Sequence, residues 1–383
     1  MKYRVTCLTP TLVGDGQRLS PIDYMVWKDH VNILDQHRIF RLLAKGPRLE
    51  SYLTQLKRAE KLDFASWGGF AQNYAGRRIP FEHPSSTQFY ERTQAENLFV
   101  PTFASSPRGP YLPASALKGA LRTGYLQQQV TEGMWKDTAS RLKSEGRLPR
   151  KPAEMLEQAA LGNGSNDALK PLMASDSDPV TTDVFKIYLL RVATLEQRGG
   201  RLELAWKTNP RGAVKRAEDS TPLFAEMAAP GASFTGDWQE KAFYKRPEIV
   251  RALRRRATLD TPTLFMAING YMEQMLALQA QYAERAGLPV LQSTVAALQE
   301  RLGQIRDANR GCILPLGWSA GFFSKTVFPD TSEDLHRDVL TQVSFYNQAL
   351  RSGLPFPKTR RVVFLGNQPA ALPGFVHLEV DGL

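Results

Sequence analysis

The sequence predicts a fold of the α+β class, and three stretches carry that prediction. Near the amino terminus, the apolar residues Tyr3, Val5 and Cys7 alternate with polar ones, which is the two-residue period of a strand with one buried face. Residues 183–195 (DVFKIYLLRVATL) have the β-branched and aromatic content of a buried strand. Residues 261–287 carry apolar side chains at helical spacing and predict one long amphipathic helix.

The amino-terminal part alternates short elements with turns, and glycine or proline marks most of the breaks. We expect, in order, a turn at Gly14 and Gly16, a β-hairpin over 24–34 that turns at 28–30, a helix over 36–44 that Gly46 and Pro47 stop, and a polar helical stretch over 48–78 with a break at Trp67, Gly68 and Gly69.

The remainder of the chain is predicted from the same signals. We expect polar, irregular chain over 131–180 with an exposed loop tip at 162–167, a strand at 203–206 that pairs with 183–195, a basic loop over 207–222, two short strands within 224–238, a helix over 291–307, a helix near 332–351, and terminal strands at 360–366 and 375–380.

The composition indicates a soluble globular protein with a polyanionic partner. Lys and Arg number 49 against 38 Asp and Glu, and the formal charge of +11 favours a nucleic acid over an acidic small molecule. Cys7 and Cys312 lie far apart, which disfavours a disulfide framework and a cysteine zinc site. The start MKYRVTCLTP lacks the apolar core of a signal peptide, and no apolar run of about 18 residues occurs. We therefore expect a cytoplasmic protein with no membrane partner.

The stretch YLPASALKGALRTGY contains an S-x-x-K pair, Ser115 and Lys118. Some acyl-transfer enzymes use this spacing for a nucleophilic hydroxyl and its base, but they also need S/Y-x-N and K-T-G elements. Neither element occurs in the sequence. Ser115 is better explained as the N-cap of a helix, where its hydroxyl accepts a free backbone N–H.

The same helix start is a candidate phosphate site. Free N–H groups and the positive end of the helix dipole attract anions, and Lys118 and Arg122, one turn apart, add charge to the same surface. Ser115, Lys118 and Arg122 are therefore candidate phosphate contacts. A solvated basic flank on an ordinary core helix explains the same pattern.

The stretch ILPLGWSAGFFSKT is a second candidate site. Its closely spaced glycines, Gly317 and Gly321, let a backbone approach a phosphate, and Lys325 follows them. Trp318 and Phe322 either stack on bases or fill the core. The loop has neither the spacing of an ATP-binding P-loop nor that of a dinucleotide-binding turn.

Basic residues recur in clusters, each of which alone is typical of a solvated face. Several clusters scattered among loops suggest a partner as long as the protein, such as an extended nucleic-acid strand. One of these clusters, in the loop 207–222, includes Lys207 and Arg211.

The sequence offers little for catalysis. The five histidines are isolated, without the pairs that bind zinc in hydrolases, and we expect no metal site and no cofactor. Asp15, Asp23 and Asp35 lie in one short stretch and are a candidate Mg²⁺ set, although turn-forming and capping roles explain them better.

Four stretches then stand in a fixed order: LTPTLVGDGQRLSPIDY (8–24), YLPASALKGALRTGY (111–125), FAEMAAPGASF (224–234) and LPLGWSAGFFSKT (314–326). In order and spacing they resemble the RAMP superfamily of CRISPR proteins, and within it the Csm-type head subunit that caps the crRNA 3′ end in type III-A complexes. The more specific parts are T-P-x-x-x-G-x-G…L-x-P-x-D-Y and S-x-L-K-G-x-x-R.

That resemblance implies a ferredoxin-like, RRM-related core with helical insertions. It implies one RAMP-type domain over 1–383, insertions at 48–110 and 131–180, a thumb-like loop at 207–222 that reaches the guide–target duplex, and a helical part at 259–307. It places Ser115, Lys118 and Arg122 on the guide backbone, beside loops shaped by Gly14, Gly16, Gly317 and Gly321. Ala114 departs from the family pattern, which often has glycine there, and Ser319 and Ala320 interrupt a usually denser glycine run.

The function implied is that of a non-catalytic subunit of a type III, III-A-like effector complex. Its expected partners are crRNA, target RNA and other subunits, and it would cap the guide 3′ end and contact the neighbouring backbone subunit. The alternative is a RAMP-fold RNA endonuclease or metal-dependent nuclease acting on crRNA or target RNA, with Asp15, Asp23 and Asp35 as candidate metal ligands.

Overall fold

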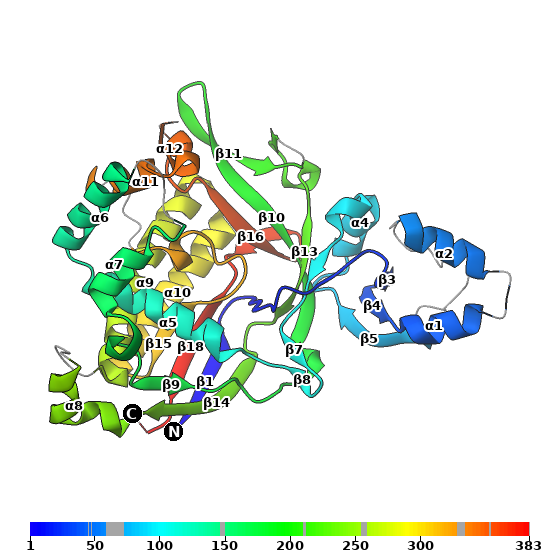
Figure 1. Ribbon diagram of the computed structural model, residues 1–383. Helices are drawn as coiled ribbons and strands as arrows, with labels where there is room; N and C mark the ends of the chain where they lie inside the picture. Colours follow the sequence, from blue (N-terminus) through cyan, green and yellow to red (C-terminus); the bar gives the residue numbers. More distant parts are fainter. Residues whose placement is uncertain are drawn as a thin grey trace.

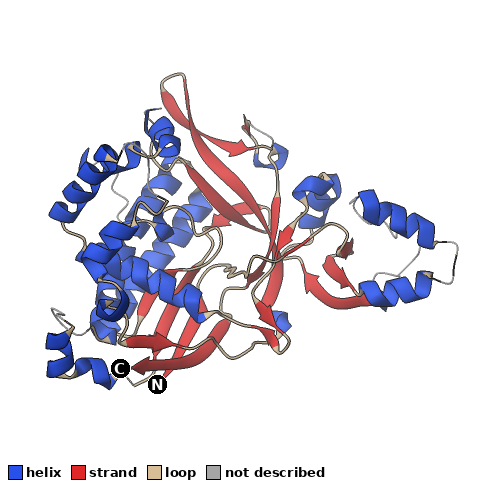
Figure 2. Ribbon diagram, in the orientation of Figure 1, coloured by secondary structure: helices blue, strands red, loops and turns tan. Residues whose placement is uncertain are grey.

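The structure is a computed structural model that describes residues 1–44, 46, 48–58, 73–145, 150–209, 212–253, 259–327, 334–351 and 354–382. Two antiparallel sheets form the body, helices cover it on one side, and a small arm extends from the other side (Figures 1 and 2). The mixture of helices with antiparallel sheets confirms the α+β class and fits the ferredoxin-like core that the resemblance implies.

The first sheet is built from both ends of the chain. Its strands lie in the order β15 (Cys312–Pro315), β18 (Phe375–Val380), β1 (Lys2–Cys7), β14 (Ser233–Glu240) and β9 (Leu172–Ala174). The predicted alternation of β1 is confirmed, because Tyr3, Val5 and Cys7 are buried and their neighbours are more exposed. Gly236 of β14 makes room for Tyr3, since a Cβ there would lie 2.6 Å from the tyrosine ring.

The second sheet is organised around the long strand β10 (Phe185–Arg198). The other strands are β11 (Arg201–Lys207), β12 (Ala213–Val214), β13 (Leu223–Ala228), β16 (Thr359–Leu365) and β17 (Gln368–Ala371). The predicted pairing of 203–206 with 183–195 is confirmed, and Gly199 and Gly200 turn the hairpin at positive φ. This β10–β11 hairpin extends beyond the body at the top of Figure 1. The two strands predicted within 224–238 are confirmed as β13 and β14, one in each sheet.

Three helices contact β15: α5 (Ala114–Gln129), α9 (Thr261–Arg285) and α10 (Pro289–Ala308). Of these, α9 packs against both α5 and α10. The long predicted helix is confirmed as α9, which Asp260 caps by accepting the N–H of Thr263 at 2.9 Å. Gly287 follows its end with φ +63°. Within the described residues, no helix combines the length and apolarity that crossing a bilayer requires.

Smaller elements complete the body. The further α-helices are α4 (Ser86–Arg92), α6 (Glu132–Ser144), α7 (Glu154–Leu161), α8 (Pro247–Ala252), α11 (Asp334–Thr341) and α12 (Ser344–Arg351). The short strands are β2 (Arg18–Leu19), β6 (Val100–Pro101), β7 (Ser105–Ser106) and β8 (Gly109–Pro110). The 3₁₀ helices are η2 (Ala95–Asn97), η3 (Gly164–Asn166), η4 (Thr182–Val184), η5 (Ala217–Asp219), η6 (Ala242–Lys245) and η7 (Phe323–Lys325).

Two predicted stretches are wrong in part. The interval 131–180 is not irregular throughout, because it contains α6 and α7; Thr131 caps α6 by accepting the N–H of Met134 at 3.4 Å. Most polar side chains of these two helices are exposed, whereas Thr138 is buried. The predicted helix near 332–351 is divided into α11 and α12.

The arm consists of a three-stranded sheet and two helices. Its elements are β3 (Tyr24–Trp27), β4 (His30–Leu34), β5 (Ala75–Pro80), α1 (Gln36–Leu43) and α2 (Leu49–Arg58). The predicted hairpin is confirmed and turns at Lys28 with φ +52°. The helical prediction for 48–78 holds for α2 and is wrong for β5, whose pairing with β4 overrides local preference. The predicted break at Trp67, Gly68 and Gly69 lies outside the described residues.

The arm has its own small core, and a buried ion pair joins it to the body. Met25, Ile39 and Tyr52 belong to a cluster separate from the main core. Arg77 of β5 donates from Nη2 to Oε1 of Glu226 on β13, whose side chain is fully buried. Burial raises the pKa of Glu226, and the charge of Arg77 opposes that rise. The ion pair therefore stabilises the contact between the arm and the body only while both side chains are charged.

Replacing Arg77 with Ala should leave the Glu226 carboxylate buried without its counter-charge. We expect a loss of about 3 kcal/mol in the free energy of unfolding at neutral pH. Without Arg77, the pKa of Glu226 in the folded state rises further above its unfolded value. The loss of stability relative to the original protein is therefore small at low pH. It grows as pH rises from the folded-state pKa of Glu226 in the original protein to that in the variant. Urea unfolding between about pH 4 and pH 8 measures this.

The matched control adds Glu226→Gln to Arg77→Ala, which removes the titrating group. The double variant should lose the additional pH dependence of the single one. A loss that is the same at every pH in Arg77→Ala alone would contradict the ion-pair explanation.

Candidate functional site

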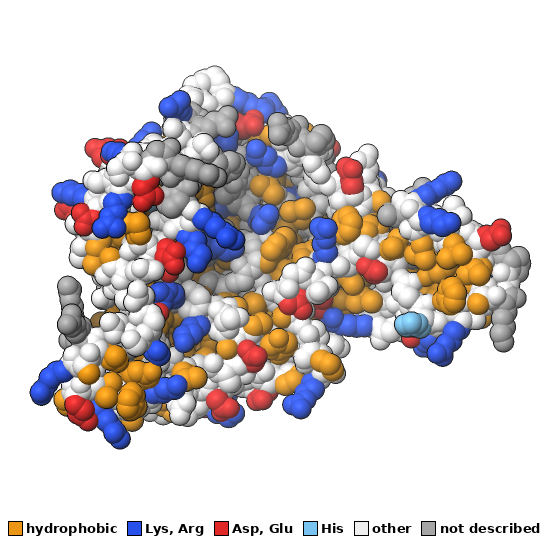
Figure 3. Space-filling model, viewed as in Figure 1, with side chains coloured by type: hydrophobic (Ala, Val, Ile, Leu, Met, Phe, Trp, Pro, Cys, Tyr) orange, Lys and Arg blue, Asp and Glu red, His pale blue; other side chains and the backbone are white. Residues whose placement is uncertain are grey.

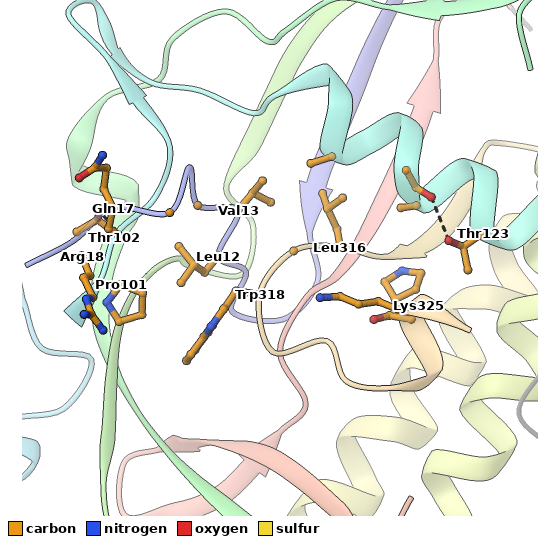
Figure 4. A pocket seen from close by; sticks show the side chains of 18 of the residues that line it. Leu12, Val13, Gln17, Arg18, Pro101, Thr102, Thr123, Leu316, Trp318 and Lys325 are labelled. Carbon is orange, nitrogen blue, oxygen red and sulfur yellow. Dashed lines mark hydrogen bonds between the residues drawn. The ribbon is translucent and has the colours of Figure 1, made fainter. Parts of the chain in front are cut away.

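A groove with a volume of about 790 Å³ lies where two glycine loops meet α5. We call residues 12–18 the first glycine loop and residues 315–325 the second glycine loop. Residues 99–102 and one face of α5 complete the lining (Figure 4). Segments far apart in the sequence therefore form one concave surface.

The first glycine loop leaves β1 and is held against residues 99–104. Val13 accepts the backbone N–H of Ala104 at 2.8 Å, and Gln17 accepts that of Thr102 at 3.3 Å. Arg18 and Leu19 then form the short strand β2, which pairs with β6. These contacts fix the loop from both ends.

The second glycine loop is locked to the first through the backbone oxygen of Leu12. The N–H of Trp318 donates to this oxygen at 2.7 Å. Gly317 has φ +85°, and a Cβ there would lie 2.1 Å from the same oxygen, so only glycine fits. Ser319 also has positive φ, at +69°. The backbone on both sides of Trp318 thus has positive φ, which sets the direction in which the side chain leaves the loop.

Helix α5 presents small residues to the groove and large ones to the core. Ala116, Gly119 and Ala120 line the groove, while Leu117 and Leu121 are buried. The buried residues recur at helical spacing, and the small side chains on the other face of the helix leave the groove open.

The predicted N-cap role of Ser115 is wrong. Helix α5 begins at Ala114, one residue earlier, and its N-cap Pro113 makes no side-chain hydrogen bond. Instead, Asp176 of a distant segment accepts the N–H of Ala114 at 2.7 Å. A residue distant in sequence, Asp176, therefore caps the helix in place of Ser115. Its carboxylate already occupies the helix start.

The charged residues that line the groove are Arg18 and Lys325, and its lining includes no Asp or Glu. Arg361 lies beside it, with its guanidinium carbon 4.9 Å from the centre of the Trp318 ring. In the described part of the chain these three cations form no ion pair. Figure 3 shows Lys and Arg side chains around the hollow at the centre of this face.

Arg122 contrasts with these cations because carboxylates surround it. Its guanidinium donates to Asp167 at 2.6 Å and to Glu157 at 3.2 Å. Partial burial lowers the pKa of Arg122, but the bonds and charges of Asp167 and Glu157 outweigh this and raise it. Lys118, one turn earlier, is exposed to solvent.

The structure brings together only some of the predicted RNA contacts. Gly14, Gly16, Gly317, Trp318 and Lys325 line one groove. The other described candidates, Ser115, Lys118, Arg122, Gly321 and Lys207, are not part of its lining, and Arg211 lies outside the described residues.

Sequence reasoning missed two residues that line the groove, Arg18 and Phe99, and placed Arg361, which lies beside it, only in a basic cluster with Lys358 and Arg360. Arg18 lies two residues after Gly16 in the opening motif, and this position in the sequence could have identified it as a groove residue. Phe99 is brought to the groove by the pairing of β2 with β6, and Arg361 by the outward face of β16. The latter two positions depend on pairing between distant segments, which the sequence does not show.

The three aspartates considered as metal ligands have local roles. Asp15 accepts the backbone N–H of Gln17 at 3.0 Å, and Asp23 accepts that of Ser20 at 2.6 Å. Asp35 caps α1 by accepting the N–H of Arg38 at 3.0 Å. Turn and cap roles are confirmed for all three. Among the described residues, no group of three His, Cys, Asp or Glu is arranged to hold a metal ion.

Comparison with known proteins gives a family and a fold. A model of the RAMP superfamily matches residues 4–256. A chain of a Csm–crRNA–target RNA ternary complex from a type III-A CRISPR-Cas system is similar with TM-score 0.65 and 19% identity, over 99% of this chain and 100% of that one. T.onnurineus Csm5 is similar with TM-score 0.63 and 17% identity, over 98% and 99%. No curated protein matches the sequence.

Replacing Gly317 with Ala should destabilise the protein, because the methyl group collides with the Leu12 oxygen and alanine must adopt positive φ. We expect a loss of at least about 2 kcal/mol in the free energy of unfolding. The matched control is Gly119→Ala, in the same groove but on α5, where a Cβ meets open space. That change should stabilise by about 0.5–1 kcal/mol through helix propensity. Urea unfolding measures both, and similar changes in the two variants would contradict the predicted locking of the loops.

Proposed function

The chain belongs to the RAMP superfamily, and from this premise we propose that it is a non-catalytic crRNA-binding subunit of a type III, III-A-like CRISPR effector complex. In this role it caps the 3′ end of the guide in the cytoplasm and contacts the neighbouring backbone subunit and the target RNA. The solved Csm–crRNA–target RNA complex contains a chain of the same fold and extent, which supports the assignment.

One observation carries the proposal: the cations at the groove lack carboxylate partners. Some Lys and Arg residues elsewhere are paired, as Lys2 is with Asp237 and Lys136 with Glu132. A cation without a partner gains a favourable interaction when a phosphate approaches, whereas a paired one must first lose its carboxylate. Arg18, Lys325 and Arg361 are therefore suited to a phosphate backbone, which is read without sequence preference.

The groove wall adds a second support. The two glycine loops expose backbone close to the groove, and Gly16 has φ +94° with open space around it. A phosphate can approach such a backbone more closely than one shielded by side chains. Gly14, Gly16, Gly317 and Gly321 remain our candidates for these close approaches.

The helix flank and the basic loop form the outer part of the proposed RNA path. Ser115, Lys118 and Arg122 lie on α5, whose other residues line the groove. Lys207 ends β11, and the buried Arg191 holds the far end of the loop 207–222 by donating to the oxygen of Ser220 at 2.6 Å. We propose this loop, with Lys207 and Arg211, as the thumb-like projection.

The domain organisation proposed with this function is one RAMP-type domain. Residues 48–110, which include α2 and β5 of the arm, and residues 131–180, which include α6 and α7, are its proposed insertions. The buried residues of the arm's separate core, Met25, Leu34, Ile39, Leu43 and Tyr52, lie mostly before residue 48, so this core extends beyond the proposed insertion. Residues 79–103 of the same interval contribute to the main core. Residues 259–307 are its helical part and include α9.

Replacing Arg18 and Lys325 together with Ala should weaken the binding of single-stranded RNA and reduce its dependence on salt. Each lost phosphate contact lowers the slope of log K against log salt by about 0.7 for a single strand, so the double variant should lose about 1.4. Filter binding at several salt concentrations measures the slope. The matched control, Lys2→Ala with Lys136→Ala, removes the same charge from exposed ion pairs. An equal effect in the control would show that net charge, and not the groove, binds RNA.

Replacing Lys118 with Ala tests the helix flank separately. Lys118 is exposed, so we expect no change in thermal stability beyond about 0.5 kcal/mol. If it contacts a phosphate, RNA binding should weaken several-fold and the salt slope should fall by about 0.7. Combining it with Arg122→Ala should weaken guide binding further, but that variant also leaves Glu157 and Asp167 without their partner. RNA retention unchanged in Lys118→Ala would remove the flank from the proposed path.

A further inference from the structure

Two aromatic rings at the groove each lie beneath an arginine. The guanidinium carbon of Arg18 is 4.4 Å from the ring centre of Phe99, and that of Arg361 is 4.9 Å from the ring centre of Trp318. Both separations fall within the range of cation–π contacts. Arg18 and Trp318 enter the groove from different loops (Figure 4). The groove therefore has two planar aromatic–guanidinium pairs in addition to its charge.

Local structure holds the first pair in place. In the pairing of β2 with β6, Arg18 lies opposite Pro101 and Leu19 opposite Val100. Phe99 directly precedes β6 and follows the fully buried Leu98. The backbone is thus fixed on both sides of this contact, and the Phe99 ring is partly exposed.

Unusual backbone geometry holds the second pair. Trp318 stands between Gly317 and Ser319, both at positive φ, and its N–H is bound to Leu12. Such a conformation is unfavourable for serine, and strain of this kind gathers at functional sites. The hydroxyl of Ser319, itself buried, accepts a hydrogen bond from Nη1 of Arg361 at 3.3 Å. The strained residue therefore positions the arginine that covers the tryptophan.

The other aromatic candidate in the loop has a different role. Phe322 packs edge-on against Phe323, Tyr346 and Phe356, with ring centres 5.1–6.1 Å apart. These contacts make it part of an aromatic cluster. Trp318 is only partly buried, lines the groove, and makes no hydrogen bond through its indole N–H to any described residue. Both residues pack against the main core, but of the two only Trp318 also lines the groove.

We propose that Arg18–Phe99 and Arg361–Trp318 are two nucleobase-stacking platforms, so that the groove takes RNA as a single strand with bases turned toward the protein. This rests on the proposed function, which brings RNA to the groove. Aromatic rings and guanidinium planes stack on any base and so add affinity without sequence preference. In a duplex the bases are already stacked and paired, and the platforms cannot reach them. The platforms thus favour single-stranded over double-stranded RNA, while the cations bind the phosphates.

The first test uses the unmodified full-length protein and two oligomers of about ten nucleotides, one of oligouridine and one abasic with the same number of phosphates. Stacking should make the uridine oligomer bind roughly tenfold or more tightly. The salt slopes of the two oligomers should be equal, because their phosphate contacts are equal.

The second test changes one ring. Trp318→Leu should weaken uridine binding roughly tenfold without changing the salt slope, and Trp318→Phe, which keeps a ring, should stay within about threefold of the original protein. In both variants binding of the abasic oligomer should be unchanged, which separates stacking from a folding defect.

The outcomes distinguish this inference from the function on which it rests. Equal binding of the uridine and abasic oligomers, with a normal salt slope, would overturn the stacking platforms and leave RNA binding intact. Absence of salt-dependent binding to both oligomers would overturn the proposed function and the platforms with it. An equal loss in Trp318→Leu and Trp318→Phe, for both oligomers, would also overturn the platforms.

Discussion

The groove depends on one backbone hydrogen bond, from the N–H of Trp318 to the oxygen of Leu12. The loops that it joins leave neighbouring parts of one sheet, because β1 and β15 both pair with β18. Glycine at 317 lets the two backbones approach this closely. The position of Trp318, the cover that Arg361 provides and the width of the groove beside α5 all follow from this contact.

Electrostatics then gives the groove its chemistry. The excess of positive charge in the composition does not by itself locate a binding site, because some of the cations are neutralised by nearby carboxylates, as Arg122 is by Asp167 and Glu157. What matters is that the cations at the groove are not neutralised. The small side chains on one face of α5 and the exposed loop backbone leave space between them, so a polyanion can reach the charged groups. The two rings covered by arginine offer flat surfaces to its bases.

Local patterns in the sequence predicted the elements well where periodicity was strong, as for β1, the β10–β11 hairpin and α9. They failed where distant contacts decide. Strand β5 pairs with β4 and so is no helix, and Asp176 takes the capping role expected of Ser115. The glycines and Trp318 of the groove were visible as motifs. Phe99 was not, and Arg361 stood out only as a member of a basic cluster, because pairing between distant strands places both at the groove. The family resemblance rests on the order of the motifs along the chain. Only the folded structure shows that the two glycine loops and α5 lie next to one another.

The most direct test of RNA in the groove is ultraviolet crosslinking of the full-length protein to a single-stranded RNA, followed by mass spectrometry of the crosslinked peptides. We predict crosslinks in three segments that are separate in sequence: 12–18, 99–102 and 315–325. Trp318 should carry one of them. Crosslinks confined to segments away from the groove, such as α10 or the arm helices, would contradict the account.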